Sequence, residues 1–130
     1  MTSPFAFEPR HVDKPWGYEL IWAESEDYVG KILFVRAGQA LSLQYHEQKD
    51  ESWLVQSGRA SLELGLVGGG LETTEIVAGD AFRYRPGTVH RVTAIEDTTI
   101  LEVSTPHLTD VVRLDDRYGR PERDETRAPG

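Results

Sequence analysis

The sequence contains no cysteine and only four histidines among its 130 residues. The lack of cysteine excludes disulfide bonds and thiolate metal ligands, so histidine, carboxylate or amide groups would have to hold any metal ion. No apolar run approaches the roughly 18 residues of a membrane span, and the N-terminal segment lacks the apolar core of a signal peptide. We therefore expect a cytoplasmic protein that has no membrane partner.

Positive charge is also scarce. The chain has 14 Lys and Arg residues against 22 Asp and Glu residues, which gives a formal net charge of -8. A nucleic-acid partner is disfavoured because phosphate backbones are bound through an excess of Lys and Arg. A small anion can still bind to individual basic side chains. We expect a chain of this length to form one domain, and it is long enough to bury a hydrophobic core.

What the sequence does contain is a series of short segments with alternating or β-branched residues, separated by glycines and other turn residues. Each segment predicts a strand followed by its turn, and the spacing of the turns is typical of a β-sandwich or small barrel. No segment has the periodicity of a long helix. We therefore predict an all-β fold, with strands in residues 18–22, 30–38, 40–46, 52–58, 59–67, 74–80, 81–87, 89–95 and 98–104.

The two ends of the chain lack apolar periodicity. We predict an N-terminal arm at residues 1–12, a barrel at residues 13–120 and a flexible tail at residues 121–130. Near the end of the barrel, the sequence from Thr109 to Arg120 favours one short helical turn, with Thr109 or Asp110 as its cap.

The segment from Leu41 to Trp53 suggests a metal site. In a strand, Gln44 and His46 project from the same face, because side chains at i and i+2 do so. If residues 47–50 form a hairpin turn, Glu51 returns opposite this pair, and His90 after a Pro-Gly turn is the fourth candidate. This set would suit one divalent ion of Zn, Mn, Fe, Co or Ni. The alternative is that these residues are simply polar positions on a surface strand.

These residues also carry a resemblance to the cupin superfamily, whose fold is a double-stranded β-helix, or jelly-roll barrel. Gly38, Gln44, His46, Glu51 and Gly58 match the first cupin motif, and Gly79, Asp80, Pro86, Gly87 and His90 match the second. The chain departs from the usual pattern at three positions. Gln44 replaces the first histidine, Arg85 replaces a proline, and Ala94 stands where many cupins have asparagine.

A longer resemblance runs from Lys14 in KPWGYE, through LSLQYH, ESWLVQSG and GTVHRV, to Arg120 at the end of VVRLDDRYGR. This pattern resembles the type II phosphomannose isomerase cupin, which is found as the C-terminal domain of bifunctional mannose-1-phosphate guanylyltransferases and also as short stand-alone proteins. The resemblance implies a metal-dependent isomerase of a phosphosugar such as mannose 6-phosphate. No Gly-rich nucleotide loop precedes the cupin region, so we expect no guanylyltransferase activity.

The resemblance also implies roles for individual residues. Besides Gln44, His46, Glu51 and His90 as metal ligands, we expect catalytic roles for Lys49, Arg120 and Glu51 and substrate-binding roles for Lys31, Arg91, Trp16 and Tyr84. Glu47, Lys49 and Tyr84 are the candidates for the base, and Glu51 is favoured as a ligand. Each basic residue has a structural alternative: Lys31, Lys49 and Arg91 can face solvent, and Arg120 can pair with Asp115 or Asp116. Trp53 is expected in the core and Trp16 near the barrel mouth.

Two other functions stay open at this point. One is an iron-dependent dioxygenase-type cupin, and the other is a cupin that binds a sugar or other small molecule without turnover. We also expect a homodimer, in which the N-terminal arm with Phe5 and Phe7 adds to a partner's sheet and covers an exposed edge.

Overall fold

The computed structural model describes residues 3–124, which form eleven strands and no helix. The all-β prediction is therefore confirmed, and each of the nine predicted segments overlaps a strand. The strands are β1 (Arg10–Lys14), β2 (Gly17–Glu24), β3 (Val29–Val35), β4 (Leu43–Tyr45), β5 (Glu51–Ser57), β6 (Arg59–Leu66), β7 (Leu71–Val77), β8 (Ala81–Tyr84), β9 (Thr88–Ala94), β10 (Thr98–Ser104) and β11 (Val112–Asp115). No helix of the described residues has the length and apolar character needed to cross a membrane.

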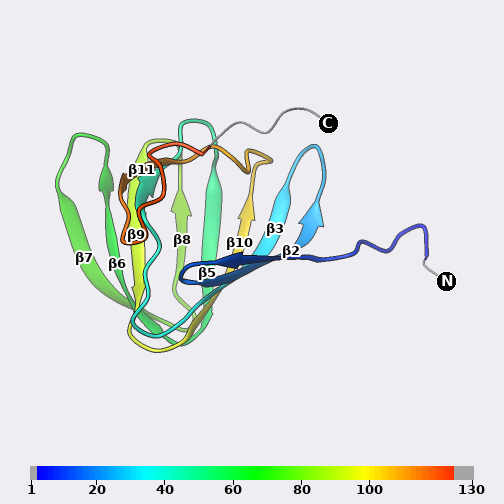
Figure 1. The fold of residues 1–130 in the computed structure, drawn as a ribbon, viewed down its shortest axis with the longest axis horizontal. Helices are drawn as coiled ribbons and strands as arrows, with labels where there is room; N and C mark the ends of the chain where they lie inside the picture. Colours follow the sequence, from blue (N-terminus) through cyan, green and yellow to red (C-terminus); the bar gives the residue numbers. More distant parts are fainter. Residues whose placement is uncertain (1–2, 125–130) are drawn as a thin grey trace.

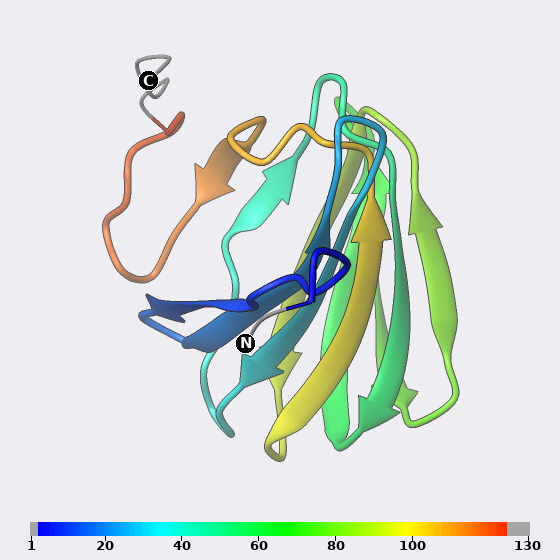
Figure 2. The same ribbon diagram turned by 90° about the vertical axis from the view of Figure 1, so that its right-hand side faces the viewer.

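The strands form two antiparallel sheets that pack against each other (Figures 1 and 2). One sheet has the strand order β1-β2-β3-β10-β5-β8, and the other has the order β11-β4-β9-β6-β7. Neighbours in a sheet are often distant in sequence: β10 lies between β3 and β5, and β9 lies between β4 and β6. This topology brings residues from the first and second halves of the chain into one interior.

Alternation along the strands decides which side chains reach that interior. In β5, Glu51, Trp53 and Val55 are buried, whereas Leu54 between them is 41% exposed. Because successive strand residues point to opposite faces, one strand supplies both polar site residues and apolar core residues. The apolar core consists of Trp16, Leu33, Val35, Leu41, Trp53, Val55, Ala60, Leu62, Ile76, Tyr84, Val92, Ala94 and Ile100.

The first strand lies partly inside the segment expected to be an arm. β1 begins at Arg10 and pairs with β2, so the pairing runs from Arg10 opposite Ile21 to Lys14 opposite Gly17. The turn between these strands needs a glycine, because a Cβ atom at Gly17 would lie 1.8 Å from the backbone oxygen of Phe34. The β1–β2 hairpin is therefore fixed against β3.

The short helical turn predicted near the C-terminus is wrong. Residues 112–115 instead form β11, which pairs with β4 and buries Val112. The predicted cap also has a different role, because the Asp110 carboxylate accepts backbone hydrogen bonds from residues 47–49. Of the predicted tail, residues 121–124 contact β11: Arg123 forms an isolated bridge with Val112, and the Arg113 amide donates to the carbonyl of Glu122. Residues 125–130 lie outside the described part of the chain.

Candidate metal centre

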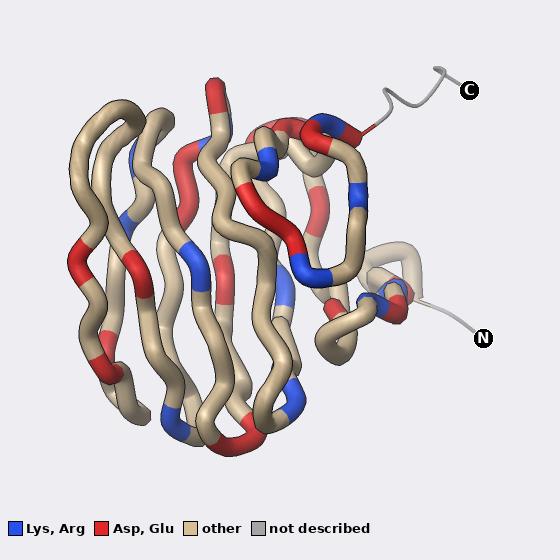
Figure 3. Tube along the Cα trace, turned by 60° about the vertical axis from the view of Figure 1, so that its left-hand side comes forward, with Lys and Arg blue, Asp and Glu red and all other residues tan. Residues whose placement is uncertain are grey.

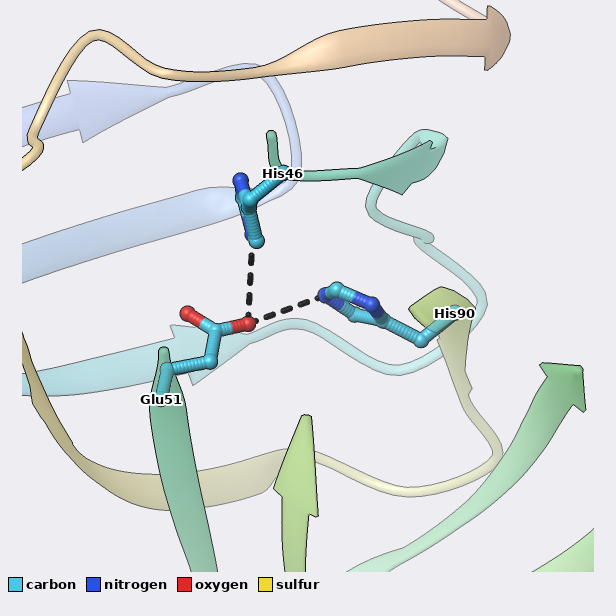
Figure 4. A group of neighbouring side chains, drawn as sticks. All are labelled: His46, Glu51 and His90. Carbon is cyan, nitrogen blue, oxygen red and sulfur yellow. Dashed lines mark hydrogen bonds and ion pairs between the residues drawn. The ribbon is translucent and has the colours of Figure 1, made fainter. Parts of the chain in front are cut away.

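Three buried side chains converge between the two sheets. His46 follows β4, Glu51 begins β5 and His90 lies in β9. The Nε2 atom of His46 lies 3.3 Å from Oε1 of Glu51, and the Nε2 atom of His90 lies 3.0 Å from the same oxygen (Figure 4). None of the three residues is more than 4% exposed. The structure thus brings together His46, Glu51 and His90, as expected from the sequence.

The hydrogen bonds on the far side of each imidazole ring orient these donors. The Nδ1 atom of His46 bonds the carbonyl oxygen of Asp110, and that of His90 bonds the carbonyl oxygen of Thr88. Because a carbonyl oxygen only accepts, each Nδ1 carries a proton, and in the neutral imidazole, which is the form that binds metals, each Nε2 presents a lone pair. Two lone pairs therefore face the Glu51 carboxylate without a proton between them. A cation placed among the three atoms resolves this conflict.

The spacing between each histidine nitrogen and Glu51 also fits a metal ion. Two donors that each lie about 2.1 Å from one ion are roughly 3.0 to 3.4 Å apart at octahedral or tetrahedral angles. The two distances from the histidine nitrogens to Glu51 fall in this range. Two imidazoles and one carboxylate suit divalent first-row ions, with protein carbonyls orienting the imidazole ligands. His46, Glu51 and His90 could therefore hold a metal ion.

The environment of Glu51 keeps its carboxylate ionised. Burial alone raises the pKa of Glu51, but the positive charge of the nearby Lys49 ammonium outweighs this effect, and the pKa lies well below its usual value. The Lys49 Nζ atom lies 2.9 Å from Oε2 of Glu51. Lys49 thus engages one carboxylate oxygen while the other faces the histidines. This division favours Glu51 as a ligand.

The loop between His46 and Glu51 crosses from one sheet to the other. We expected a hairpin here, and that expectation is wrong: β4 belongs to the five-stranded sheet, and β5 belongs to the six-stranded sheet. The Asp110 carboxylate holds the loop by accepting the backbone N–H groups of Glu47, Gln48 and Lys49. These bonds outweigh the effect of burial and lower the pKa of Asp110. Asp110 therefore fixes both the loop and, through its carbonyl, the His46 ring.

Gln44 lies beside the three-residue cluster. It is paired with His90 across β4 and β9, so both side chains project from the same face of the sheet. Gln44 and His46 also line a common cavity. The Oε1 atom of Gln44 accepts a hydrogen bond from Ser42, at 2.7 Å. Because an amide oxygen has two lone pairs, it keeps one for a further contact.

Buried charges continue from Glu51 across the inner face of the six-stranded sheet. Glu102 lies 3.3 Å from Lys49 and 3.6 Å from Lys31, and its other oxygen accepts the Trp53 indole N–H at 2.9 Å. Lys31 also contacts Glu19, at 3.2 Å. Burial tends to lower the pKa of Lys49, but Glu102 and Glu51 outweigh this effect and raise it, so Lys49 stays a cation.

Two cavities adjoin this network of charged residues. An inner cavity of about 70 Å³ is lined by Trp16, Gln44, His46 and Lys49, together with other residues. An outer cavity of about 830 Å³ lies between the β1–β2 hairpin and residues 106–110. Both cavities are lined by Lys14, Glu19, Lys31, Leu108, Asp110 and Asp124. A small molecule in the outer cavity would therefore lie near the candidate metal ligands.

Two aromatic residues expected to bind substrate are deeply buried. Trp16 is 2% exposed, belongs to the core and also lines the inner cavity. Tyr84 is 1% exposed and stacks on the His90 ring, with centroids 4.2 Å apart. Burial, followed by the charges of Glu51 and Glu102, raises the pKa of Tyr84, so its phenol stays protonated. Tyr84 therefore supports a ligand ring, and Trp53 lies in the core as expected.

The two arginines in the predicted site have different positions. Arg120 lines the inner cavity, and its side chain donates two hydrogen bonds to Asp116, each 2.9 Å long, from Nε and Nη2. This is one of the structural pairs that we considered from the sequence. Arg91, in contrast, makes ion pairs with Glu63 and Asp115 and lines neither of the two cavities. Of the two arginines, the structure thus brings only Arg120 to the site.

Sequence reasoning missed several charged residues of the site, including Lys14, Glu19 and Glu102. Lys14 and Glu19 line both cavities, and Glu102 joins Lys31 to Lys49. A signal for Glu102 existed in the strand TTILEVS, where Glu102 shares a face with Ile100 and is thus a charge at an inward position. Lys14 and Glu19 flank a hairpin turn, and no local pattern told us that this turn faces the site.

The family comparison agrees with this architecture. Residues 6–116 match the family model described as "Mannose-6-phosphate isomerase C-terminal", and the chain belongs to this family. Related proteins include mannose-1-phosphate guanylyltransferase 2 of Escherichia coli O157:H7, which is 30% identical over 115 residues. That alignment covers 84% of this chain and 23% of the relative.

The alignments with two further relatives cover similar shares of both chains. Mannose-1-phosphate guanylyltransferase ManC of Salmonella typhimurium is 32% identical over 116 residues, covering 85% of this chain and 23% of the relative. Xanthan biosynthesis protein XanB of Xanthomonas campestris pv. campestris strain B100 is 34% identical over 118 residues, covering 85% and 24%. The chain thus spans about a quarter of the length of these curated relatives.

Solved structures confirm the cupin fold. Oxalate decarboxylase from Bacillus subtilis at pH 4.6 has a TM-score of 0.72 and 18% identity, covering 85% of this chain and 31% of its own. KdgF from Halomonas sp. has a TM-score of 0.62 and 25% identity, covering 75% and 88%. Another oxalate decarboxylase structure, described by its Mn(II) centres, has a TM-score of 0.68 and 21% identity, covering 80% and 29%. The similarity to the decarboxylases concerns the fold alone.

Proposed function

We propose that this protein is a metal-dependent aldose–ketose isomerase of a phosphosugar, with mannose 6-phosphate as the first substrate to test. The observation that carries the proposal is the buried His46–Glu51–His90 donor set next to cavities lined by lysines. Membership of the mannose-6-phosphate isomerase family supports this choice of reaction. The metal ligands in the proposal are His46, Glu51 and His90, with Gln44 as the fourth.

The reaction moves a proton between C1 and C2, so it needs a base, an electrophile and a way to stabilise enediolate charge. A bound divalent ion would polarise the carbonyl oxygen and stabilise the negative charge. The chain itself supplies the remaining parts. The Lys49 cation lies against Glu51 and holds its carboxylate in the orientation described above. Trp16 and Leu41 contribute apolar surface to the wall of the inner cavity.

The contacts of the three candidate bases support the choice of a different residue as the base. Lys49 stays protonated, the pKa of Tyr84 is raised, and Glu47 is exposed and paired with Arg123. The carboxylate that we propose instead is Glu19, which lines both cavities and is held by Lys31 through one oxygen. Burial raises the pKa of Glu19, but Lys31 and Lys14 together lower it below its usual value. Glu19 is therefore ionised at neutral pH and able to accept a proton.

The decisive experiment is isomerisation in heavy water. The protein is stripped of metal, loaded separately with Zn, Mn, Co, Ni or Fe, and given mannose 6-phosphate while NMR follows fructose 6-phosphate and deuterium at C2. We expect turnover with at least one ion, and loss of turnover in Glu19→Gln with metal binding retained. Absence of both signals with every ion would overturn the isomerase proposal and leave a binding protein or an oxygen-using cupin.

Two expectations from the sequence remain predictions. The cytoplasmic location rests on the composition of the chain, and the homodimer rests on the apolar N-terminal segment, where Phe5 is 95% exposed. Guanylyltransferase activity, which the relatives' names describe, is not part of this proposal.

A further inference from the structure

The carboxylates that line the two cavities are already paired. Glu19 contacts Lys31, Asp110 accepts three backbone N–H groups, and Asp124 pairs with Arg113. Each of these negative charges therefore has a donor that satisfies it inside the protein. A ligand in the cavities would meet little uncompensated negative charge, although the whole chain carries a net charge of -8.

The basic side chains of the cavities are also paired, with one exception. Arg10, Lys31, Lys49, Arg113 and Arg120 each form an ion pair with a carboxylate. Lys14 lines both cavities and has no carboxylate within 4.0 Å among residues 3–124. Among the lysines and arginines of the cavity walls, Lys14 is thus the one that forms no ion pair with a described residue, although its charge acts on Glu19 and helps to lower the pKa of that carboxyl. Elsewhere, acidic and basic positions are interspersed along the chain (Figure 3).

The position of Lys14 is built into the fold. Lys14 ends β1 and pairs with Gly17 beside the hairpin turn. Gly17 packs closely against the backbone of Phe34 in β3, so the hairpin lies against that strand. Two residues after Lys14, Trp16 lines the inner cavity, and its buried indole Nε1 has no hydrogen-bond partner in the described part of the chain. Figure 2 shows the hairpin on the same side of the molecule as β11 and the segment before it.

We propose that Lys14 forms the subsite for the phosphate group of the substrate, at the junction of the two cavities. This inference rests on the proposed isomerase function for the identity of the ligand, a sugar phosphate. A phosphomonoester brings up to two negative charges and several acceptor oxygens, for which an unpaired ammonium group is a suitable partner. With phosphate at Lys14, the sugar carbons extend along the inner cavity towards Gln44 and His46. Lys31, one of the residues that we expected from the sequence to bind substrate, forms ion pairs with Glu19 and Glu102 instead.

The first test measures phosphate binding without turnover. Inorganic phosphate is titrated by calorimetry into the metal-loaded wild type, Lys14→Gln and Lys14→Arg. Because a hydrogen bond to a charged group contributes about 1.5 to 3 kcal/mol, we expect Lys14→Gln to bind phosphate roughly 10- to 100-fold more weakly. Lys14→Arg should retain most of the affinity. The matched control is Arg85→Gln, which removes an exposed cation that lines neither cavity.

The outcomes separate this inference from the proposed function. If Lys14→Gln binds phosphate as tightly as the wild type, or if the wild type does not bind phosphate, the subsite is wrong. If Lys14→Gln alone weakens binding but no metal supports isomerisation, the subsite stands and the isomerase proposal fails. With an active enzyme, Lys14→Gln should raise KM for mannose 6-phosphate more than it lowers kcat, because in this proposal Lys14 binds the phosphate group and does not itself transfer the exchanged proton.

Discussion

In the candidate metal centre, the two polar atoms of each side chain contact different partners. In each histidine, Nδ1 donates to a backbone carbonyl and Nε2 faces Glu51; in Glu51, Oε1 faces the histidines and Oε2 faces Lys49. Such division fixes the orientation of every donor before a ligand arrives. The site therefore depends on single atoms, and single substitutions should affect it strongly.

At this scale we predict that His46→Ala abolishes retention of a divalent ion. The variant removes one of the three candidate metal ligands, so only His90 and Glu51 of the cluster remain. Metal content after gel filtration, measured by mass spectrometry, should fall to the background level. The control His107→Ala removes a histidine that lines the outer cavity outside the cluster, and its metal content should match the wild type. Full metal retention in His46→Ala would exclude the proposed ligand set.

A second residue-scale prediction concerns Glu102. This carboxylate lies between two buried lysines, so Glu102→Gln leaves positive charge in the interior without its partner. Breaking a buried ion pair typically costs about 3 to 5 kcal/mol, and we expect the free energy of unfolding to fall by a few kcal/mol. Urea denaturation measures this change. The control Glu96→Gln alters a surface ion pair with Arg59, and should change stability by under about 1 kcal/mol.

At the scale of elements, the β1–β2 hairpin depends on one close backbone contact. In Gly17→Ala, the new Cβ would meet the Phe34 carbonyl oxygen at 1.8 Å, so the hairpin has to move away from β3. We expect a loss of at least about 2 kcal/mol in the free energy of unfolding, together with weaker substrate binding in the adjoining cavities. Gly70→Ala is the control, since its added Cβ meets no atom within 4 Å. Equal stability of both variants would contradict this account of the hairpin.

The C-terminal segment should show a defined pH dependence. Hydrogen bonds from Arg120 lower the pKa of Asp116, so the pair stabilises the fold fully above the carboxyl's unfolded-state pKa of about 3.9. This contribution is lost as the pH falls through the lower folded-state pKa. Asp116→Asn should therefore cost stability at pH 7 and cost much less at pH 2. Chemical denaturation at both pH values measures the difference, and an equal cost at both would refute the assignment.

At the scale of the whole molecule, the first part of the described chain leaves Phe5 and Phe7 exposed, at 95% and 42%. We predict a homodimer in which this segment covers part of a second copy. Light scattering should give twice the monomer mass for the wild type and the monomer mass for a Phe5→Ser, Phe7→Ser double variant. A monomeric wild type at micromolar concentration would contradict the prediction. If the double variant remains dimeric, the arm is not the contact.

The sequence by itself determined the class of fold and pointed to the three residues of the candidate metal centre. Alternating residues and regular glycine turns predict antiparallel strands, because a period of two separates a buried face from an exposed face. The same rule places His46 and His90 on inward positions, and it could also have placed Arg91 outward, since it follows His90 directly. These features depend on neighbours along the chain, which the sequence shows.

Only the tertiary structure decided how distant segments meet. The loop between His46 and Glu51 passes from one sheet to the other, and residues 112–115 become an edge strand beside β4. Long-range pairing likewise places Glu102 between two lysines and turns the Lys14 hairpin towards the cavities. Such contacts depend on which strands become neighbours, and this is a property of the packed molecule as a whole. Local residue patterns therefore predict the candidate metal ligands, while the arrangement of the two sheets decides the charge and shape of the surrounding cavities.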